Sequence, residues 1–190
     1  MDFLFLLEER KMTIYECSKR SGIPYSTLSD ILHGKTKMEK ASFRYAYYLS
    51  KTLGITMEEL YEQTHVPERV SFEHFKSFTC HRVKEEGDKG FIVDMLSGDE
   101  IRNYYRWKWF PESFYLLAML DYLSRENSIP LCSDYDDLRE LKLAAPLYPV
   151  SVDAASLVMN NDTLRAEAFS NALPEFLRHN IVESEVRNVI

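Results

Sequence analysis

The stretch that decides the N-terminal fold is SKRSGIPYSTLSDILHGKTK, from Ser18 to Lys37. Two short helical patterns meet in it. Gly22 can adopt the left-handed conformation that ends a helix, and Pro24 suits the first turn of the next helix. Ser18 is small enough for two helices to cross, and four apolar residues are spaced to hold the second helix against the first: Cys17, Ile23, Leu28 and Ile31. The pattern predicts a helix-turn-helix, with a plain helical hairpin as the alternative.

Further helices are predicted on both sides of this stretch. Residues 3–10 form a first helix that offers Phe3, Leu4, Leu6 and Leu7 to a core. Thr13, with Glu16 three residues later, predicts a capping box at the start of the second helix. The third helix covers 25–33 and is closed by Gly34, the fourth covers 39–53 and is ended by Gly54, and Thr56 caps a fifth. Five helices in this order, with HGKTK directly after the third, favour a DNA-reading device over a plain hairpin.

The longer segment MTIYECSKRSGIPYSTLSDILHGKTKMEKASFRYAYYLSKTLGITMEELYE resembles the Xre or phage-repressor/Cro family of helix-turn-helix domains. The resemblance covers about residues 3–62 and implies a five-helix, lambda-repressor-like domain whose third helix enters the major groove. It implies that base edges are faced by Tyr25, Ser26, Thr27, Ser29 and Asp30. It also implies that phosphates are met by the amides at the start of the second helix and by His33, Lys35 and Lys37.

Two positions depart from the family pattern. Ile14 stands where many relatives have Gln at the start of the second helix, and Pro24 replaces the Ser or Thr that often caps the third. The cap of the third helix must therefore come from elsewhere or from a phosphate. Because small domains of this kind act as dimers on half-sites about one helical turn apart, we expect a homodimer on a palindromic double-stranded DNA operator.

Charge is distributed unevenly along the 190 residues, whose net charge is −7. Residues 1–66 carry nine basic and nine acidic side chains, whereas residues 67–190 carry 14 and 21. Residues 11–44 alone hold seven basic against three acidic side chains, which permits phosphate contact at one end of an acidic chain. The helical pattern ends around His65-Val66-Pro67, which predicts a DNA-binding domain over 1–66 and a second domain over 67–190.

The second domain is predicted to be mostly helical. Residues 111–127 are apolar on nearly every side, which predicts a central buried helix. After Pro146 the pattern fits either a loop with a short helix or a strand, and Pro174 is expected to open a closing helix over 174–184.

Three groups in the second domain could carry chemistry, and a structural interpretation is favoured for each. The acidic residues could hold a divalent ion but more simply mark a helix start: Asp134, Asp136, Asp137 and Glu140. YYRWKWF, residues 104–110, could bind single-stranded nucleic acid but fits a core edge or a partner surface better. The spacing of His74, Cys80 and His81 matches no metal motif, so we expect structural or surface roles and no metal.

The function class follows from these observations. No apolar run approaches the roughly 18 residues that span a bilayer, and three widely spaced cysteines fit a reducing cytoplasm. Because no catalytic spacing appears, an enzyme domain fused to a DNA-binding module is disfavoured, and no cofactor is expected. We expect a cytoplasmic transcriptional repressor whose second domain dimerises or binds a partner. It could be the antitoxin of a toxin–antitoxin pair, with the toxin held by residues 67–190, or a ligand- or peptide-sensing repressor.

Overall fold

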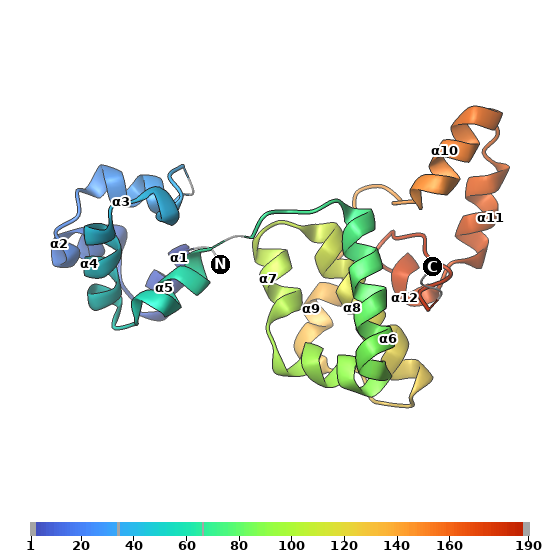
Figure 1. The fold of residues 1–190 in the computed structure, drawn as a ribbon, viewed down its shortest axis with the longest axis horizontal. Helices are drawn as coiled ribbons and strands as arrows, with labels where there is room; N and C mark the ends of the chain where they lie inside the picture. Colours follow the sequence, from blue (N-terminus) through green and yellow to red (C-terminus); the bar gives the residue numbers. More distant parts are fainter. Residues whose placement is uncertain (1–2, 34, 66, 188–190) are drawn as a thin grey trace. The chain divides into compact units, whose positions relative to one another are not determined.

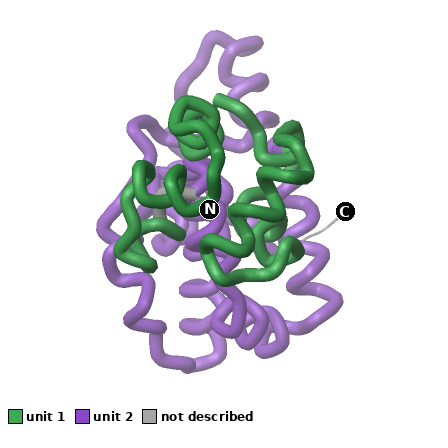
Figure 2. The backbone as a smooth tube through the Cα atoms, turned by 90° about the vertical axis from the view of Figure 1, so that its left-hand side faces the viewer, with its two compact units in different colours: residues 1–68 green, residues 69–190 purple. Residues whose placement is uncertain are grey.

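The chain divides into two compact units, residues 1–68 and 69–190, which Figure 2 colours separately. The computed structural model describes residues 3–33, 35–65 and 67–187. Gly34 and Val66, which the sequence places at a helix end and at the domain boundary, lie outside the described residues, as do the side chains of Phe3 and Leu4.

Unit 1 is built from five α-helices and one 3-10 turn among its described residues, and it confirms the expected five-helix order (Figure 1). These are α1 (Phe3–Glu9), α2 (Ile14–Ser21), α3 (Tyr25–Leu32), η1 (Met38–Lys40), α4 (Phe43–Leu53) and α5 (Met57–Thr64). Leu6 and Leu7 of α1 are buried against residues of the other helices, including Leu49 and Leu60. The Arg10 side chain donates from Nε to the Leu53 carbonyl at 2.7 Å, which ties the end of α1 to the end of α4.

Three helix ends in unit 1, at Thr13, Gly54 and Thr56, follow the predicted capping residues, whereas the start of the fourth helix does not. Thr13 and Thr56 each form a capping box with the glutamate three residues later, and Gly54 ends α4 with φ 69°. The fourth helix, however, begins at Phe43 and not at residue 39. The reason is that the Ser42 hydroxyl accepts from the Tyr45 N–H at 3.3 Å and so caps a new helix, while the preceding residues form the separate turn η1.

Unit 2 is also helical, as predicted. Its described elements are α6 (Phe72–Ser97), α7 (Glu100–Arg106), α8 (Phe110–Glu126), η2 (Ser133–Tyr135), α9 (Asp136–Arg139), α10 (Val150–Met159), α11 (Thr163–Asn171) and α12 (Pro174–Leu177). The long α6 is two helical pieces joined at Gly87, where φ is 72° and ψ is 162°. Residues that carry a side chain rarely adopt this backbone conformation, so the glycine at position 87 permits the kink.

Helix α8 is the centre of unit 2, and the prediction of a central buried helix is confirmed. Every residue from 112 to 121 is buried, and α6, α7 and α12 pack around it. The cluster that forms around α8 includes large side chains from each neighbour: Phe75 and Phe91 from α6, Ile101 from α7 and Phe176 from α12.

The C-terminal part follows the loop-and-helix alternative after Pro146 and differs from the prediction at the closing helix. The segment after Pro146 makes one isolated parallel bridge, Leu147 to Ile181, and then forms the helical hairpin α10–α11. The expected closing helix does open at Pro174 but stops at Leu177. Asn180 has φ 61°, so the chain turns there, and the bridge next to it replaces further helical hydrogen bonds.

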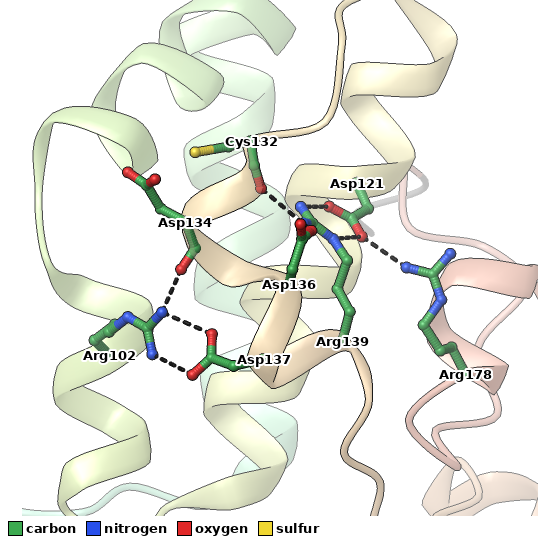
Figure 3. Close-up of polar contacts among 8 residues, drawn as sticks. All are labelled: Arg102, Asp121, Cys132, Asp134, Asp136, Asp137, Arg139 and Arg178. Atoms are coloured by element: carbon green, nitrogen blue, oxygen red, sulfur yellow. Dashed lines mark hydrogen bonds and ion pairs between the residues drawn. The ribbon is translucent and has the colours of Figure 1, made fainter.

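A buried carboxylate joins three parts of unit 2 (Figure 3). Asp121 of α8 is 2% exposed and accepts from Arg139 of α9 at 2.8 and 2.9 Å and from Arg178 at 2.9 Å. Arg139 also donates to the Cys132 carbonyl at 2.6 Å. The hydrogen bonds that Arg139 donates to Asp121 raise the pKa of Arg139, so its guanidinium stays charged. The three segments are thus linked through one side chain.

Two members of the acidic cluster of the sequence, Asp136 and Asp137, pair with arginines beside this network. Asp137 accepts two hydrogen bonds of 2.8 Å from Arg102, which lower its pKa, and Arg102 also reaches the Asp134 carbonyl. Asp136 pairs with Arg139 at 2.6 Å. Asp136 and Asp137 begin α9, but that helix has only four residues and no side-chain cap. Among the described residues, no three His, Cys, Asp or Glu side chains converge as metal ligands would.

Replacing Asp121 by alanine should destabilise unit 2 by about 3–5 kcal/mol, because Arg139 would be left as a buried charge without its main partner. Both tryptophans, Trp107 and Trp109, belong to unit 2, so urea unfolding followed by tryptophan fluorescence reports on this unit. Asp162→Ala, which removes an 89% exposed carboxylate from a surface ion pair, is the control and should leave the transition unchanged. Equal transitions for the two variants would contradict the structural role of Asp121.

The stability of unit 2 should also fall as pH drops below about 6.5, because of His179. This ring is fully buried, stacks on Phe114 and donates from Nδ1 to the Leu141 carbonyl at 2.6 Å. Burial lowers its pKa from the ordinary value of 6.5, so below that pH the unfolded chain binds a proton that the folded chain does not. The free energy of unfolding should decline by at most about 1.4 kcal/mol per pH unit from this group. In His179→Gln, which retains a donor, that decline should disappear, and an unaltered slope would contradict the assignment.

Candidate nucleic-acid interface

The turn between α2 and α3 is closed by one serine. The Ser18 hydroxyl donates to the Ile23 carbonyl at 2.6 Å, and the Gly22 N–H donates to the Ser18 carbonyl at 2.9 Å. Gly22 has φ 69°, as the prediction of a left-handed glycine requires. The sequence identified Ser18 only as a small residue at the crossing. The spacing of residues in the sequence does not predict the hydrogen bond that Ser18 makes across the turn.

Apolar side chains hold α3 at a fixed angle to α2. Cys17 and Leu28 are fully buried, and Ile23 and Ile31 are 1% and 5% exposed, so all four predicted positions lie in the interior. Burial raises the pKa of the Cys17 thiol to about 11, so the side chain stays neutral and packs as a small apolar group. The inner face of α3 is therefore occupied, and its opposite face is left for solvent.

The predicted base-reading residues lie mainly on that outer face of α3. Tyr25 is 53% exposed, Ser26 is exposed, and Ser29 and Asp30 are partly exposed. Residues four apart on a helix are neighbours, which gives two adjacent rows, 25–29–33 and 26–30. Thr27 is half-buried and one turn before the buried Ile31, so it lies at the edge of this face. The structure thus brings together all five residues, with Thr27 at the edge of the face.

The segment after α3 folds back on the end of the helix and carries the predicted phosphate contacts. The Thr36 N–H donates to the Asp30 carbonyl at 3.0 Å, and the exposed Lys35 ammonium lies 3.6 Å from the Asp30 carboxylate. Lys35 therefore offsets the negative charge of Asp30. Lys37 is exposed, and no carboxylate in the described part of the chain pairs with it. Of the two lysines, Lys37 is the freer to meet a phosphate.

His33 has one ring nitrogen already engaged. Its Nδ1 lies 2.7 Å from the Ser29 carbonyl and 3.3 Å from the Ser29 hydroxyl. A carbonyl only accepts, so Nδ1 carries a proton, and Nε2 of the neutral ring is then an acceptor. His33 can donate from Nε2 to a phosphate only in its protonated form.

The starts of the two helices differ as anion sites. At α2 the Glu16 carboxylate accepts from the Thr13 N–H at 2.9 Å, a bond that lowers the pKa of Glu16, so the protein supplies its own anion there. At α3 the cap is Pro24, which has no side-chain group to satisfy the first amides. The N-terminus of α3 therefore has the more open amides of the two.

Helix α4 exposes aromatic and basic side chains that the sequence analysis did not single out. Phe43 is 75% exposed, and Tyr47 and Tyr48 are 44% and 39% exposed. The Arg44 guanidinium lies 5.5 Å from the Tyr48 ring centre, and the Lys51 ammonium lies 5.8 Å from that of Tyr47. The four-residue spacing of Phe43 and Tyr47 is a signal for a shared helix face, but it does not tell a buried face from an exposed one.

The remaining candidates are built into unit 2. His74 and His81 are exposed, while Cys80 lies with its Sγ 3.5 Å from the Tyr115 hydroxyl. In YYRWKWF the Tyr104 ring contacts two tryptophans and Phe75, and burial raises its pKa to about 12. The structure therefore places this motif at the edge of the core around α8.

Comparison with known proteins identifies the class of the N-terminal part. Residues 5–74 match the family model described as the Cro/C1-type helix-turn-helix DNA-binding domain. Comparison of the chain with curated proteins and with solved structures finds no match.

The N-terminal part of this chain is therefore a Cro/C1-type helix-turn-helix DNA-binding domain, and the predicted resemblance is confirmed. The match reaches residue 74, twelve residues beyond the end that the sequence motifs suggested. The presence of such a domain indicates that the protein is a DNA-binding transcription regulator. No helix in the described part of the chain is both long and apolar enough to cross a bilayer.

Replacing Lys35 and Lys37 by alanine should weaken binding to every duplex and make the salt dependence shallower. Each lost phosphate contact should reduce the slope of log K against log salt by about 0.9. Fluorescence anisotropy with a labelled duplex at several salt concentrations gives the slope, and Lys84→Ala in unit 2 is the control. A double variant with the slope of the parent protein would show that these lysines do not contact phosphate.

Proposed function

We propose that this protein is a sequence-specific transcriptional repressor that reads an operator with α3. The observation that carries the proposal is the outer face of α3, where Tyr25 and Ser26 are exposed in a domain of the Cro/C1 type. A polar face on the second helix of such a unit is suited to hydrogen bonding with base edges in the major groove.

Some side chains on and beside this face are suited to reading base edges, and others to positioning α3 on the DNA backbone. The hydroxyls of Ser26 and Ser29 can donate to or accept from several bases, and the Asp30 carboxylate can accept from a cytosine amine. Tyr25 can contact a sugar or a thymine methyl group. Lys37, with Lys35 and protonated His33, would fix the register of α3 by contacting phosphates.

Repression follows from occupancy of the operator and requires no catalysis by this chain. A homodimer would place two copies of α3 on half-sites about one helical turn apart. The antitoxin form and the ligand- or peptide-sensing form stay hypotheses about unit 2, and double-stranded DNA is the partner that unit 1 supports.

The proposal is tested by selecting preferred sites from a randomised duplex library. The Tyr25→Ala and Ser26→Ala variants should accept a wider set of sequences and lose about 1–3 kcal/mol of discrimination at the affected positions. Their binding to non-specific DNA should stay close to that of the parent.

The matched control is Tyr61→Ala, which truncates a tyrosine of α5 that is 51% exposed, close to the exposure of Tyr25. It should leave sequence preference unchanged. If the parent protein shows no preference among duplexes, or if the α3 variants weaken every duplex equally, base readout by α3 is wrong.

A further inference from the structure

Unit 1 contains two histidines, His33 and His65, and both lie at the segment between α3 and α4. His33 is the residue directly after α3 and opens this segment. His65, at the end of α5, reaches it through Glu39 of η1, whose Oε1 lies 2.5 Å from Nδ1 of His65. The same segment carries Lys35 and Lys37, which we expect to contact phosphates. Side chains that ionise near neutral pH therefore contact the segment on both sides of its lysines.

A neutral His33 presents an acceptor to a phosphate. Its Nδ1 donates to the Ser29 carbonyl at 2.7 Å, which leaves Nε2 as the acceptor of an exposed ring. A phosphate oxygen is also an acceptor, so the two atoms repel each other. Protonation makes Nε2 a charged donor, and a phosphate beside the ring favours the protonated form in turn. A hydrogen bond from His33 to a phosphate therefore requires the uptake of one proton.

His65 acts on the charge of Glu39. A carboxylate only accepts, so Nδ1 of His65 carries the hydrogen of this bond in the neutral ring and in the charged ring alike. The neutral ring leaves the negative charge of Glu39 in place two residues after Lys37, whereas the protonated ring forms an ion pair with it. The Tyr61 ring stacks on His65 with 4.9 Å between ring centres. His65 is thus a positioning residue that would affect a phosphate through Glu39.

The net charge of the segment depends on both rings. Asp30 and Lys35, the charged side chains nearest to His33 along the chain, pair with each other at 3.6 Å. With neutral histidines the charged side chains of residues 30–40 sum to +1: Asp30, Lys35, Lys37, Glu39 and Lys40. A proton on each histidine raises this local charge to +3. A gain of positive charge at the DNA-facing end of α3 strengthens phosphate binding.

We propose that DNA binding by unit 1 is coupled to proton uptake at His33 and His65, so that the segment after α3 binds the DNA backbone more tightly as pH falls. His33 acts directly by donating to a phosphate, and His65 acts by neutralising Glu39. The inference rests on the proposed function, because it describes the regulation of the surface that binds the operator. It concerns phosphates alone and is independent of the bases that α3 reads.

The test measures the affinity of the full chain for a labelled duplex of arbitrary sequence by fluorescence anisotropy, at one salt concentration and from about pH 5.5 to 8. As pH falls, the Kd of the parent should decrease by up to about tenfold per pH unit for each histidine that takes up a proton. Calorimetry in two buffers of different ionisation enthalpy counts these protons. His33→Gln and His65→Gln should each lose part of the pH dependence, and the double variant should lose most of it.

Two further variants distinguish the charge from the shape of the side chain. His33→Lys carries a charge throughout this pH range, so at about pH 8 it should bind more tightly than the parent and depend less on pH. Glu39→Gln removes the carboxylate on which His65 acts, so it should tighten binding at high pH and abolish the contribution of His65. A variant that unfolded would instead bind weakly at every pH, and circular dichroism would show the loss of helix.

His81→Gln is the matched control. His81 is also exposed, and its Nδ1 lies 2.8 Å from the Ser77 carbonyl four residues earlier, but it belongs to α6 of unit 2. This variant should keep the pH dependence of the parent. A parent whose Kd does not change with pH, a double variant with the dependence of the parent, or a His81→Gln protein that loses it would each overturn the proposal. Because the duplex has an arbitrary sequence, a failure of base readout by α3 would leave these results unchanged, so the two failures are distinguishable.

Discussion

The hydrogen bond from the Ser18 hydroxyl to the Ile23 carbonyl, at 2.6 Å, holds the turn on which the DNA-binding unit depends. It lets the chain leave α2 at Gly22 and enter α3 at Tyr25 without a side-chain cap. The apolar residues then fix the angle, because Cys17 and Leu28 are fully buried between the helices. The exposed face of α3 is what remains once this packing is satisfied. Its polar residues are thus presented by a rigid support, which base readout requires.

Unit 2 is organised by a different constraint, the burial of one carboxylate. Asp121 is surrounded by two arginines from separate segments, so α8, α9 and the chain after α12 are ordered together (Figure 3). A buried ionic network of this kind is demanding in geometry, since losing one member leaves a charge without a partner. Among the described residues, the apolar core around α8 includes none from the hairpin α10–α11, and the aliphatic side chains of α10 stay exposed. One part of the unit is thus dedicated to stability, and another presents a surface.

The comparison between sequence and structure separates local from distant effects. Capping residues and glycines acted locally, so the ends of α2 and α5 and the left-handed turn at Gly22 were predictable. Ser42 is also a local cap, so the prediction that the fourth helix begins at residue 39 was wrong for a reason that lies within the neighbouring sequence. The early end of α12 at Leu177 was not predicted for another reason, since the bridge between Leu147 and Ile181 joins residues far apart in the chain.

The sequence by itself determined the helical class, the helix-turn-helix and the residues of α3, because these depend on spacing, capping and conformation within about 20 neighbouring residues. Tertiary structure alone decided which surfaces remain free. It engaged Asp30 with Lys35 and left the aliphatic stripe of α10, which comprises Val150, Leu157 and Val158, uncovered. The physical reason is that exposure and ion pairing depend on what packs against a side chain. An apolar stripe has the same spacing whether it faces a core or a partner.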